Sequence, residues 1–108
     1  MRRPLTDDES LAWWRAAIAG KKPPIYEDTP HPGWFKRRLV KDGPWVPIRL
    51  WWHQETCPET GQLIADAYIC CDCDGKPADP ERHWVSACAP PISPQEYDYM
   101  LRLSRYAK

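Results

Sequence analysis

The chain has 108 residues, a length typical of one domain spanning residues 1–108, and its 15 basic and 15 acidic side chains leave no net charge at pH 7. The balanced charge argues against the strongly basic pattern of many nucleic-acid-binding domains. No apolar run approaches the roughly 18–20 residues that span a bilayer, and no apolar segment follows the basic start, as a secretory signal would require. We therefore expect a cytoplasmic protein without a membrane partner.

The first predicted element is a helix over residues 7–19. Thr6 and Glu9 have the spacing of a capping box, and Gly20 ends the pattern. Apolar residues recur at helical spacing in between: Leu11, Trp14 and Ile18. Four prolines in the following segment, residues 20–33, predict an extended linker.

Residues 34–78 change to the period of two that is typical of antiparallel strands. Turns are predicted at Asp42-Gly43, at residues 58–61 and at Asp74-Gly75. They separate three to four predicted strands: residues 34–41, 45–53 and about 63–73, with a short return at 76–78 as the fourth. Pro47 lacks a backbone N–H, so we expect its strand to lie at a sheet edge or to carry a bulge.

Two helical segments are predicted after the strands. Asp79 and Pro80 favour a single helical turn, with Asp79 as its cap. Ser93, with proline and glutamate in the first turn, predicts a helix over residues 94–106. Four of its apolar residues are expected to face a core: Tyr97, Met100, Leu101 and Leu103. The predicted fold class is α+β, a small antiparallel sheet flanked by an N-terminal and a C-terminal helix, with an SH3-like barrel as the alternative.

Zinc binding is an alternative function of the cysteine-rich second half. Zinc needs four thiolate or imidazole ligands, and the paired C-x₂-C spacing of common zinc sites is absent. The candidate ligands are Cys71, Cys73, His83 and Cys88. We expect instead small, buried, unmetallated thiols and no cofactor, with a zinc-stabilised structural domain as an alternative.

Enzymatic activity is not expected. The chain has no G-x-S-x-G, no H-E-x-x-H and no phosphate-binding glycine loop, and its five glycines are dispersed. We therefore interpret the chain as a non-enzymatic protein.

A basic and aromatic segment supports a nucleic-acid-binding alternative. Cations that track phosphates beside aromatics that stack on bases are typical of single-strand binders. The candidate contacts are Lys36, Arg37, Arg38, Lys41 and Arg49. Strand alternation, however, divides the Lys-Arg-Arg run between two faces of the sheet.

Protein binding is the preferred hypothesis, because several large side chains do not fit the apolar rows of the strands. Tryptophan and arginine dominate the energetic centres of protein interfaces. The candidate contacts are Trp45, Arg49, Trp51 and Trp13.

The segment PGWFKRRLVKDGPWVPIRLWW, residues 32–52, is similar to a motif in a family of small phage and prophage proteins. The resemblance extends to the turn PETG, to the strand end Cys73-Asp74-Gly75 and to PPISPQEYDYMLRL at residues 90–103. It implies a phage origin and the cytoplasm of a bacterial host, but it implies no activity and transfers no site residue. With it we expect an accessory protein that binds a host or phage protein complex stoichiometrically, for example to inhibit a host defence complex in the manner of an anti-CRISPR protein.

Overall fold

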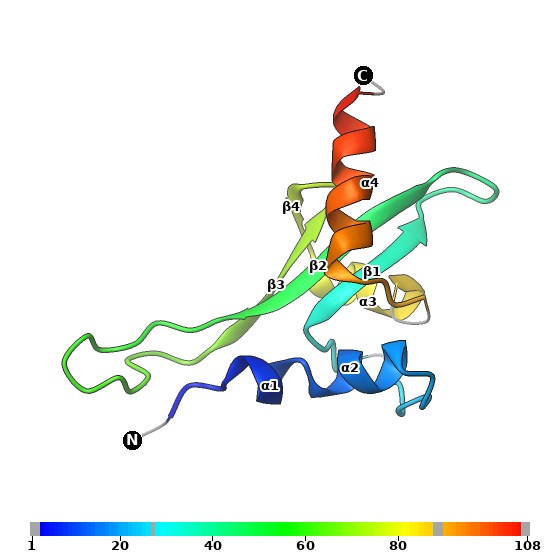
Figure 1. Cartoon of the computed structure of the whole chain (residues 1–108). Coiled ribbons are helices and arrows are strands. Elements are labelled where there is room, and N and C mark those ends of the chain that lie inside the picture. Colours follow the sequence, from blue (N-terminus) through cyan, green and yellow to red (C-terminus); the bar gives the residue numbers. More distant parts are fainter. Residues whose placement is uncertain (1–2, 27, 88–89, 107–108) are drawn as a thin grey trace.

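The computed structural model describes residues 3–26, 28–87 and 90–106 and shows an open four-stranded antiparallel sheet with helices at both ends (Figure 1). This confirms the predicted α+β class. The strand order β1-β2-β3-β4 leaves β1 and β4 at the two edges, so the SH3-like barrel is not observed. The elements are α1 (Asp7–Ser10), α2 (Ala12–Ile18), β1 (Gly33–Arg38), β2 (Trp45–His53), β3 (Tyr68–Cys73), β4 (Lys76–Ala78), α3 (Pro80–Ala87) and α4 (Pro94–Tyr106).

β2 lies in the middle of the sheet, paired with β1 on one side and β3 on the other. The expectation of an edge strand or a bulge at Pro47 is therefore wrong, since the pairing of β2 with β1 runs through Pro47 without a break. The ladder with β3 begins at Ile48, one residue later, and the Pro47 carbonyl accepts from the Asp74 backbone N–H at 2.9 Å. The N–H and C=O of a strand residue point to the same side, so an N–H at position 47 would point toward β3, as the Pro47 carbonyl does. The ladder with β3 does not extend to this position, so the proline removes no ladder hydrogen bond.

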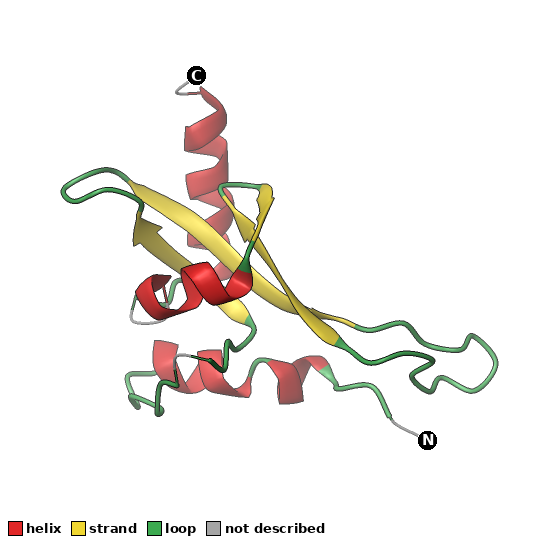
Figure 2. Ribbon diagram, turned by 180° about the vertical axis from the view of Figure 1, so that it is seen from behind, coloured by secondary structure: helices red, strands yellow, loops and turns green. Residues whose placement is uncertain are grey.

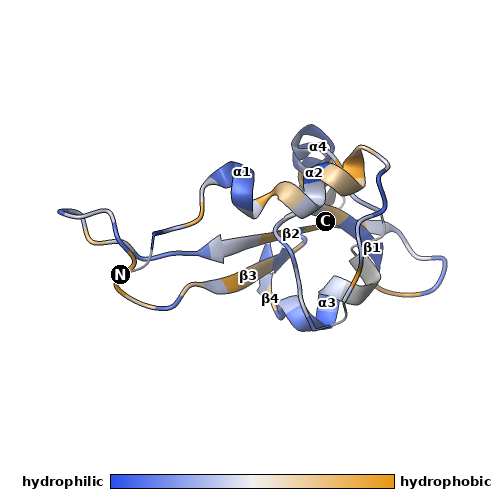
Figure 3. Cartoon of the chain, turned by 90° about the horizontal axis from the view of Figure 1, so that it is seen from below, coloured by the Kyte–Doolittle hydropathy of each residue, from blue (hydrophilic) through white to orange (hydrophobic). Residues whose placement is uncertain are grey.

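The two faces of the sheet are covered by different helices. Seen from behind, α3 lies in front of the sheet and α4 behind it (Figure 2), and an edge-on view shows the sheet between them (Figure 3). The core lies on the α3 side, where Phe35, Ile48 and Leu50 are buried against Trp84. The predicted alternation of apolar residues along β2 is thus confirmed, since Ile48 and Leu50 share this face.

Two tryptophan indoles fix the proline-rich linker, residues 20–33, against the body. Trp13 Nε1 donates to the Pro24 carbonyl and Trp84 Nε1 donates to the Tyr26 carbonyl, both at 2.8 Å. A third indole, that of Trp14, donates to the carbonyls of Trp34 and Ile92. These bonds tie the linker and the segment before α4 to the body through backbone carbonyls.

The N-terminal helix differs from its prediction. The capping box of Thr6 and Glu9 is confirmed, but the helix is interrupted at Leu11, where φ is −96° and ψ is 6°. The Ser10 hydroxyl donates to the Asp7 carbonyl that also accepts from the Leu11 N–H. Such side-chain bonds to the preceding turn compete with the helical pattern.

The third strand is shorter than predicted, because the β2–β3 connection is unequal. His53 pairs with Tyr68, and Thr56 forms an isolated bridge with Leu63. Between these two pairs, residues 54–55 lie opposite residues 64–67. Two residues cannot pair one-to-one with four, so the ladder is not continuous. The connection, residues 54–67, projects from the body, and we call it the β2–β3 arm (Figure 1).

The last two helices follow their capping signals. Asp79 caps α3 as predicted, with its carboxylate accepting from the Glu81 N–H at 3.0 Å, but α3 has eight residues where one turn was predicted. α4 has its predicted bounds, and the Ser93 hydroxyl accepts from the Glu96 N–H at 3.1 Å.

Candidate functional site: a groove between α4 and the β1–β2 hairpin

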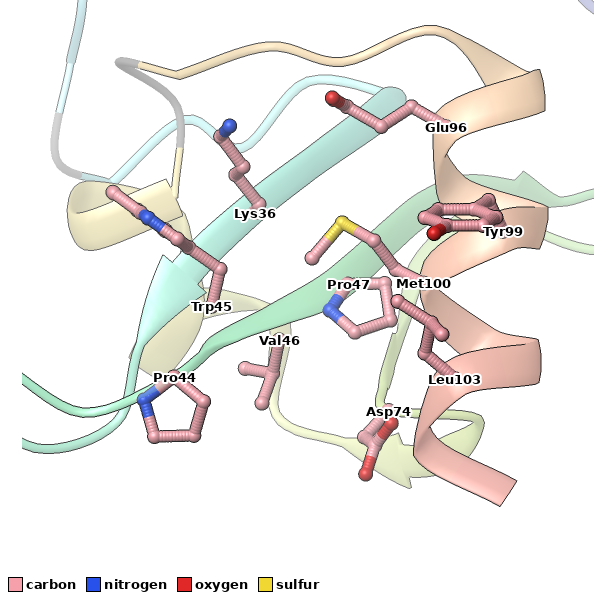
Figure 4. Close-up of a pocket in the computed structure, with 10 residues that line it drawn as sticks. All are labelled: Lys36, Pro44, Trp45, Val46, Pro47, Asp74, Glu96, Tyr99, Met100 and Leu103. Carbon is pink, nitrogen blue, oxygen red and sulfur yellow. The ribbon is translucent and has the colours of Figure 1, made fainter. Parts of the chain in front are cut away.

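An apolar groove of about 540 Å³ separates α4 from the end of the β1–β2 hairpin (Figure 4). Its volume falls within the roughly 300–1,000 Å³ range that is usual for binding sites. We call it the α4 groove. It is lined by Lys36, Pro44, Trp45, Val46, Pro47, Asp74, Glu96, Tyr99, Met100 and Leu103.

One wall of the α4 groove is a single stripe of α4. Residues 96, 99, 100 and 103 have the spacing of one helical face. Tyr97, on another face, is buried as predicted, but Leu103 is 50% exposed and Tyr99 is 58% exposed. The apolar stripe therefore passes beyond the part of the sheet that could bury it.

The opposite wall is held in place by cation–π contacts around Trp45. The Lys36 ammonium lies 5.0 Å from the centre of the Trp45 ring, and the Arg38 guanidinium carbon lies 4.5 Å from it. These contacts orient a tryptophan that is 42% exposed. The groove thus presents a large aromatic side chain that is both fixed and accessible.

Charged groups of both signs stand at the edges of the groove. Figure 4 shows Lys36 and Glu96 toward one end and Asp74 toward the other. Asp74 is placed by the β3–β4 turn, where its φ is 54° and that of Gly75 is 81°. Residues with positive φ at both central positions give the tight hairpin that the sequence predicts there.

The predicted protein-binding residues do not form one patch. Arg49 is exposed, and its guanidinium carbon lies 5.6 Å from the Trp34 ring and 5.5 Å from the half-buried Trp51 ring. Trp45 belongs to the groove wall. Trp13 is partly buried against the core, with its ring 4.9 Å from that of Trp84 and stacked on His31.

The predicted nucleic-acid-binding residues are divided between the two faces. Lys36 and Arg38 lie on the groove side and contact Trp45, and Lys41 lies in the exposed hairpin turn. Arg37 points to the opposite face, where its guanidinium lies 2.9 Å from His83 Nδ1. Lys36 and Arg38 already contact the Trp45 ring, so a base stacking there would compete with them.

The suggested zinc ligands are not assembled in the part of the chain that the structure describes, where no group of three or more potential ligands occurs. Cys88 lies outside the described residues. Burial raises the pKa of the Cys71 thiol to about 12, and burial also raises the pKa of Cys73. The pKa of His83 is lowered by burial and by Arg37, whose positive charge beside the imidazole also opposes a metal cation.

Tyr99, Met100 and Leu103 are groove residues that the sequence did not indicate as functional. Met100 and Leu103 have the spacing of core residues. The local sequence does not show that the sheet is too short to cover them.

No helix within the described residues is long and apolar enough to cross a membrane. Comparison of the chain with models of protein families, with curated proteins and with solved structures gives no match. The site is therefore interpreted from its own geometry.

Proposed function

We propose that this chain is a non-enzymatic binding protein that holds a partner protein in the α4 groove. The observation that carries the proposal is the groove itself, an accessible apolar hollow with Trp45 fixed in one wall and Tyr99 and Leu103 exposed in the other. Contiguous exposed apolar surface on a small protein commonly marks an interaction site. Buried aromatic anchors supply much of the binding energy at such sites.

The resemblance to phage and prophage proteins provides the proposed setting. We place the protein in the bacterial cytoplasm and expect a host protein complex as its partner, with inhibition of a host defence complex as the concrete version. Stoichiometric occlusion of such a complex needs a surface but no chemistry, and the groove supplies a surface of that kind.

A capture experiment with a groove variant tests the proposal. Tagged wild-type protein and Leu103→Asp are exposed to bacterial lysate that has been treated with nuclease, and retained proteins are quantified by mass spectrometry. Leu103 is half exposed, so Asp there should leave the fold intact while placing a charge in the apolar wall. We expect one protein or complex to be retained near one-to-one by the wild type and reduced at least about tenfold by Leu103→Asp.

Ile64→Asp is the matched control. Ile64 is a 64% exposed aliphatic residue that does not line the α4 groove. Its variant should retain the partner as the wild type does. Equal retention by Leu103→Asp and the wild type would refute the groove as the site. Retention seen only in a parallel lysate without nuclease, and lost with added salt, would favour the nucleic-acid alternative.

A further inference from the structure

The tip of the β1–β2 hairpin is an apolar projection beside the α4 groove. Leu39 is 53% exposed and Val40 is 65% exposed. Neither residue lines the groove, although the same hairpin supplies the groove wall through Trp45. One hairpin therefore supplies both an apolar projection and a wall of an apolar hollow.

The position of Val40 is set by a tight turn. The Gly43 N–H donates to the Val40 carbonyl at 3.0 Å, and Asp42 has a φ of 60°. A Cβ added at Gly43 would come within 2.5 Å of Val40 Cγ2, so the Val40 side chain packs directly over the glycine. The apolar tip is thus a formed element, and its presentation needs little further ordering.

The charges of the tip complement those of the groove. Lys41 and Asp42 follow Val40 at the tip, and both are exposed. One end of the groove carries Glu96, which suits Lys41, and Lys36, which suits Asp42 (Figure 4). The cation and the anion of the hairpin tip are thus matched by an anion and a cation of the groove.

In a dimer with two-fold symmetry, the hairpin tip of each copy can occupy the α4 groove of the other. In a symmetric dimer the same patch is used twice, so a projection must lie beside the hollow that receives its copy. The hairpin of one copy would enter between the hairpin and α4 of the second, which places the second hairpin in the groove of the first. The net charge of zero at pH 7 leaves no overall repulsion between copies.

We propose that a second copy of this chain occupies the α4 groove in the absence of a partner, with Val40 of each copy inserted into the groove of the other. The inference rests on the proposed function, because it makes self-association the competitor of partner binding at the same site. The dimer shields the apolar groove from water until a tighter-binding partner displaces one copy.

Sedimentation-velocity ultracentrifugation over a wide concentration range, from low micromolar upward, tests the inference. We expect the wild type to pass from monomer to dimer as its concentration rises. Val40→Asp should raise the dimer dissociation constant at least about tenfold, because the carboxylate would enter an apolar groove. Ile64→Asp, at a position of nearly equal exposure on the β2–β3 arm, should dimerise as the wild type does.

Charge reversal tests the predicted arrangement within the dimer. Lys41→Glu and Glu96→Lys should each weaken dimerisation, and the combined variant should recover a large part of the loss. Single variants that add independently, without recovery, would overturn this arrangement.

The two proposals fail in different ways. Val40→Asp should weaken dimerisation at least about tenfold but retain partner capture, because it leaves the groove lining intact. Leu103→Asp should weaken both. A wild type that stays monomeric at every concentration would overturn the dimer and leave partner binding standing. Dimers that persist in Val40→Asp, or a groove filled by another ligand in the purified protein, would likewise overturn it.

Discussion

At the scale of single residues, the cysteines show how local surroundings control thiol chemistry in this chain. Cys57 lies in the turn of the β2–β3 arm, where hydrogen bonds from the backbone N–H groups of Thr60 and Glu59 and from the Thr60 hydroxyl lower its pKa. Cys71 lies in the core at 3% exposure, and burial raises its pKa to about 12. The thiolate is the reactive form, so the two residues should differ widely in reactivity.

We predict that iodoacetamide modifies Cys57 first and Cys71 last among the described cysteines. Peptide mapping by mass spectrometry after timed alkylation at mildly alkaline pH gives the order. Thr60→Val removes the hydroxyl donor and should slow modification of Cys57 about two- to threefold. Modification of Cys71 before Cys57 in the folded protein would show that the core is more open than the structure indicates.

At the scale of secondary-structure elements, the contact between α2 and the start of β1 depends on a glycine. Gly33 has a φ of 153°, and a Cβ there would lie 2.6 Å from the Trp14 side chain. Trp14 cannot easily move away, because its indole bonds to the carbonyls of Trp34 and Ile92 and joins β1 to the segment before α4.

We predict that Gly33→Ala lowers the free energy of unfolding by about 2–4 kcal/mol, from backbone strain and overpacking together. Gly20→Ala is the control, since Gly20 also has a positive φ of 83° but has nothing within 4 Å of an added Cβ. It should cost only about 1–2 kcal/mol. Urea denaturation followed by tryptophan fluorescence measures the free energy of unfolding of both variants. Equal losses would mean that the Trp14 side chain moves away from an added Cβ without an energetic cost.

The elements that could be predicted are those specified by local signals. Alternation placed Ile48 and Leu50 on the buried face, and the Ser93 cap gave the start of α4. The break at Leu11 and the short third strand depend on bonds and on unequal segment lengths that periodicity does not report. The groove could not be predicted, because it depends on how far α4 runs past the sheet, which is a property of tertiary packing.

At the scale of the whole molecule, the docking of α3 on the sheet makes stability depend on pH. His83 of α3 is buried, with its Nδ1 2.9 Å from the guanidinium of Arg37 in β1; burial, Arg37 and Arg82 lower its pKa, while Asp79 raises it. Burial also lowers the pKa of His31, which stacks on Trp13. The unfolded chain, with an ordinary histidine pKa of about 6.5, therefore takes up protons at a higher pH than the folded chain does.

We predict that stability is fully present above about pH 6.5 and falls as the pH decreases through the range between the unfolded and folded histidine pKa values. His83→Asn keeps an acceptor for Arg37 but cannot be protonated, so its loss of melting temperature between about pH 7.5 and pH 5 should be smaller than that of the wild type. Glu9, whose pKa is lowered to about 2, titrates below this range.

His53→Asn is the matched control for this prediction. His53 lies at the surface, 3.4 Å from Glu55, and its substitution should leave the pH-dependent loss unchanged. A His83→Asn variant with the wild-type pH dependence would show that His83 does not carry the effect.

The β2–β3 arm gives the molecule a point of attachment far from its groove. The chain measures 48 × 32 × 23 Å, and the arm extends from the body at the end opposite the β1–β2 hairpin (Figure 1). Its turn is closed by its own bonds, such as the one from the Gly61 N–H to the Cys57 carbonyl at 2.7 Å. A fluorophore attached to Cys57 would therefore follow the tumbling of the whole particle, and its anisotropy would report assembly without obstructing the surfaces that assemble.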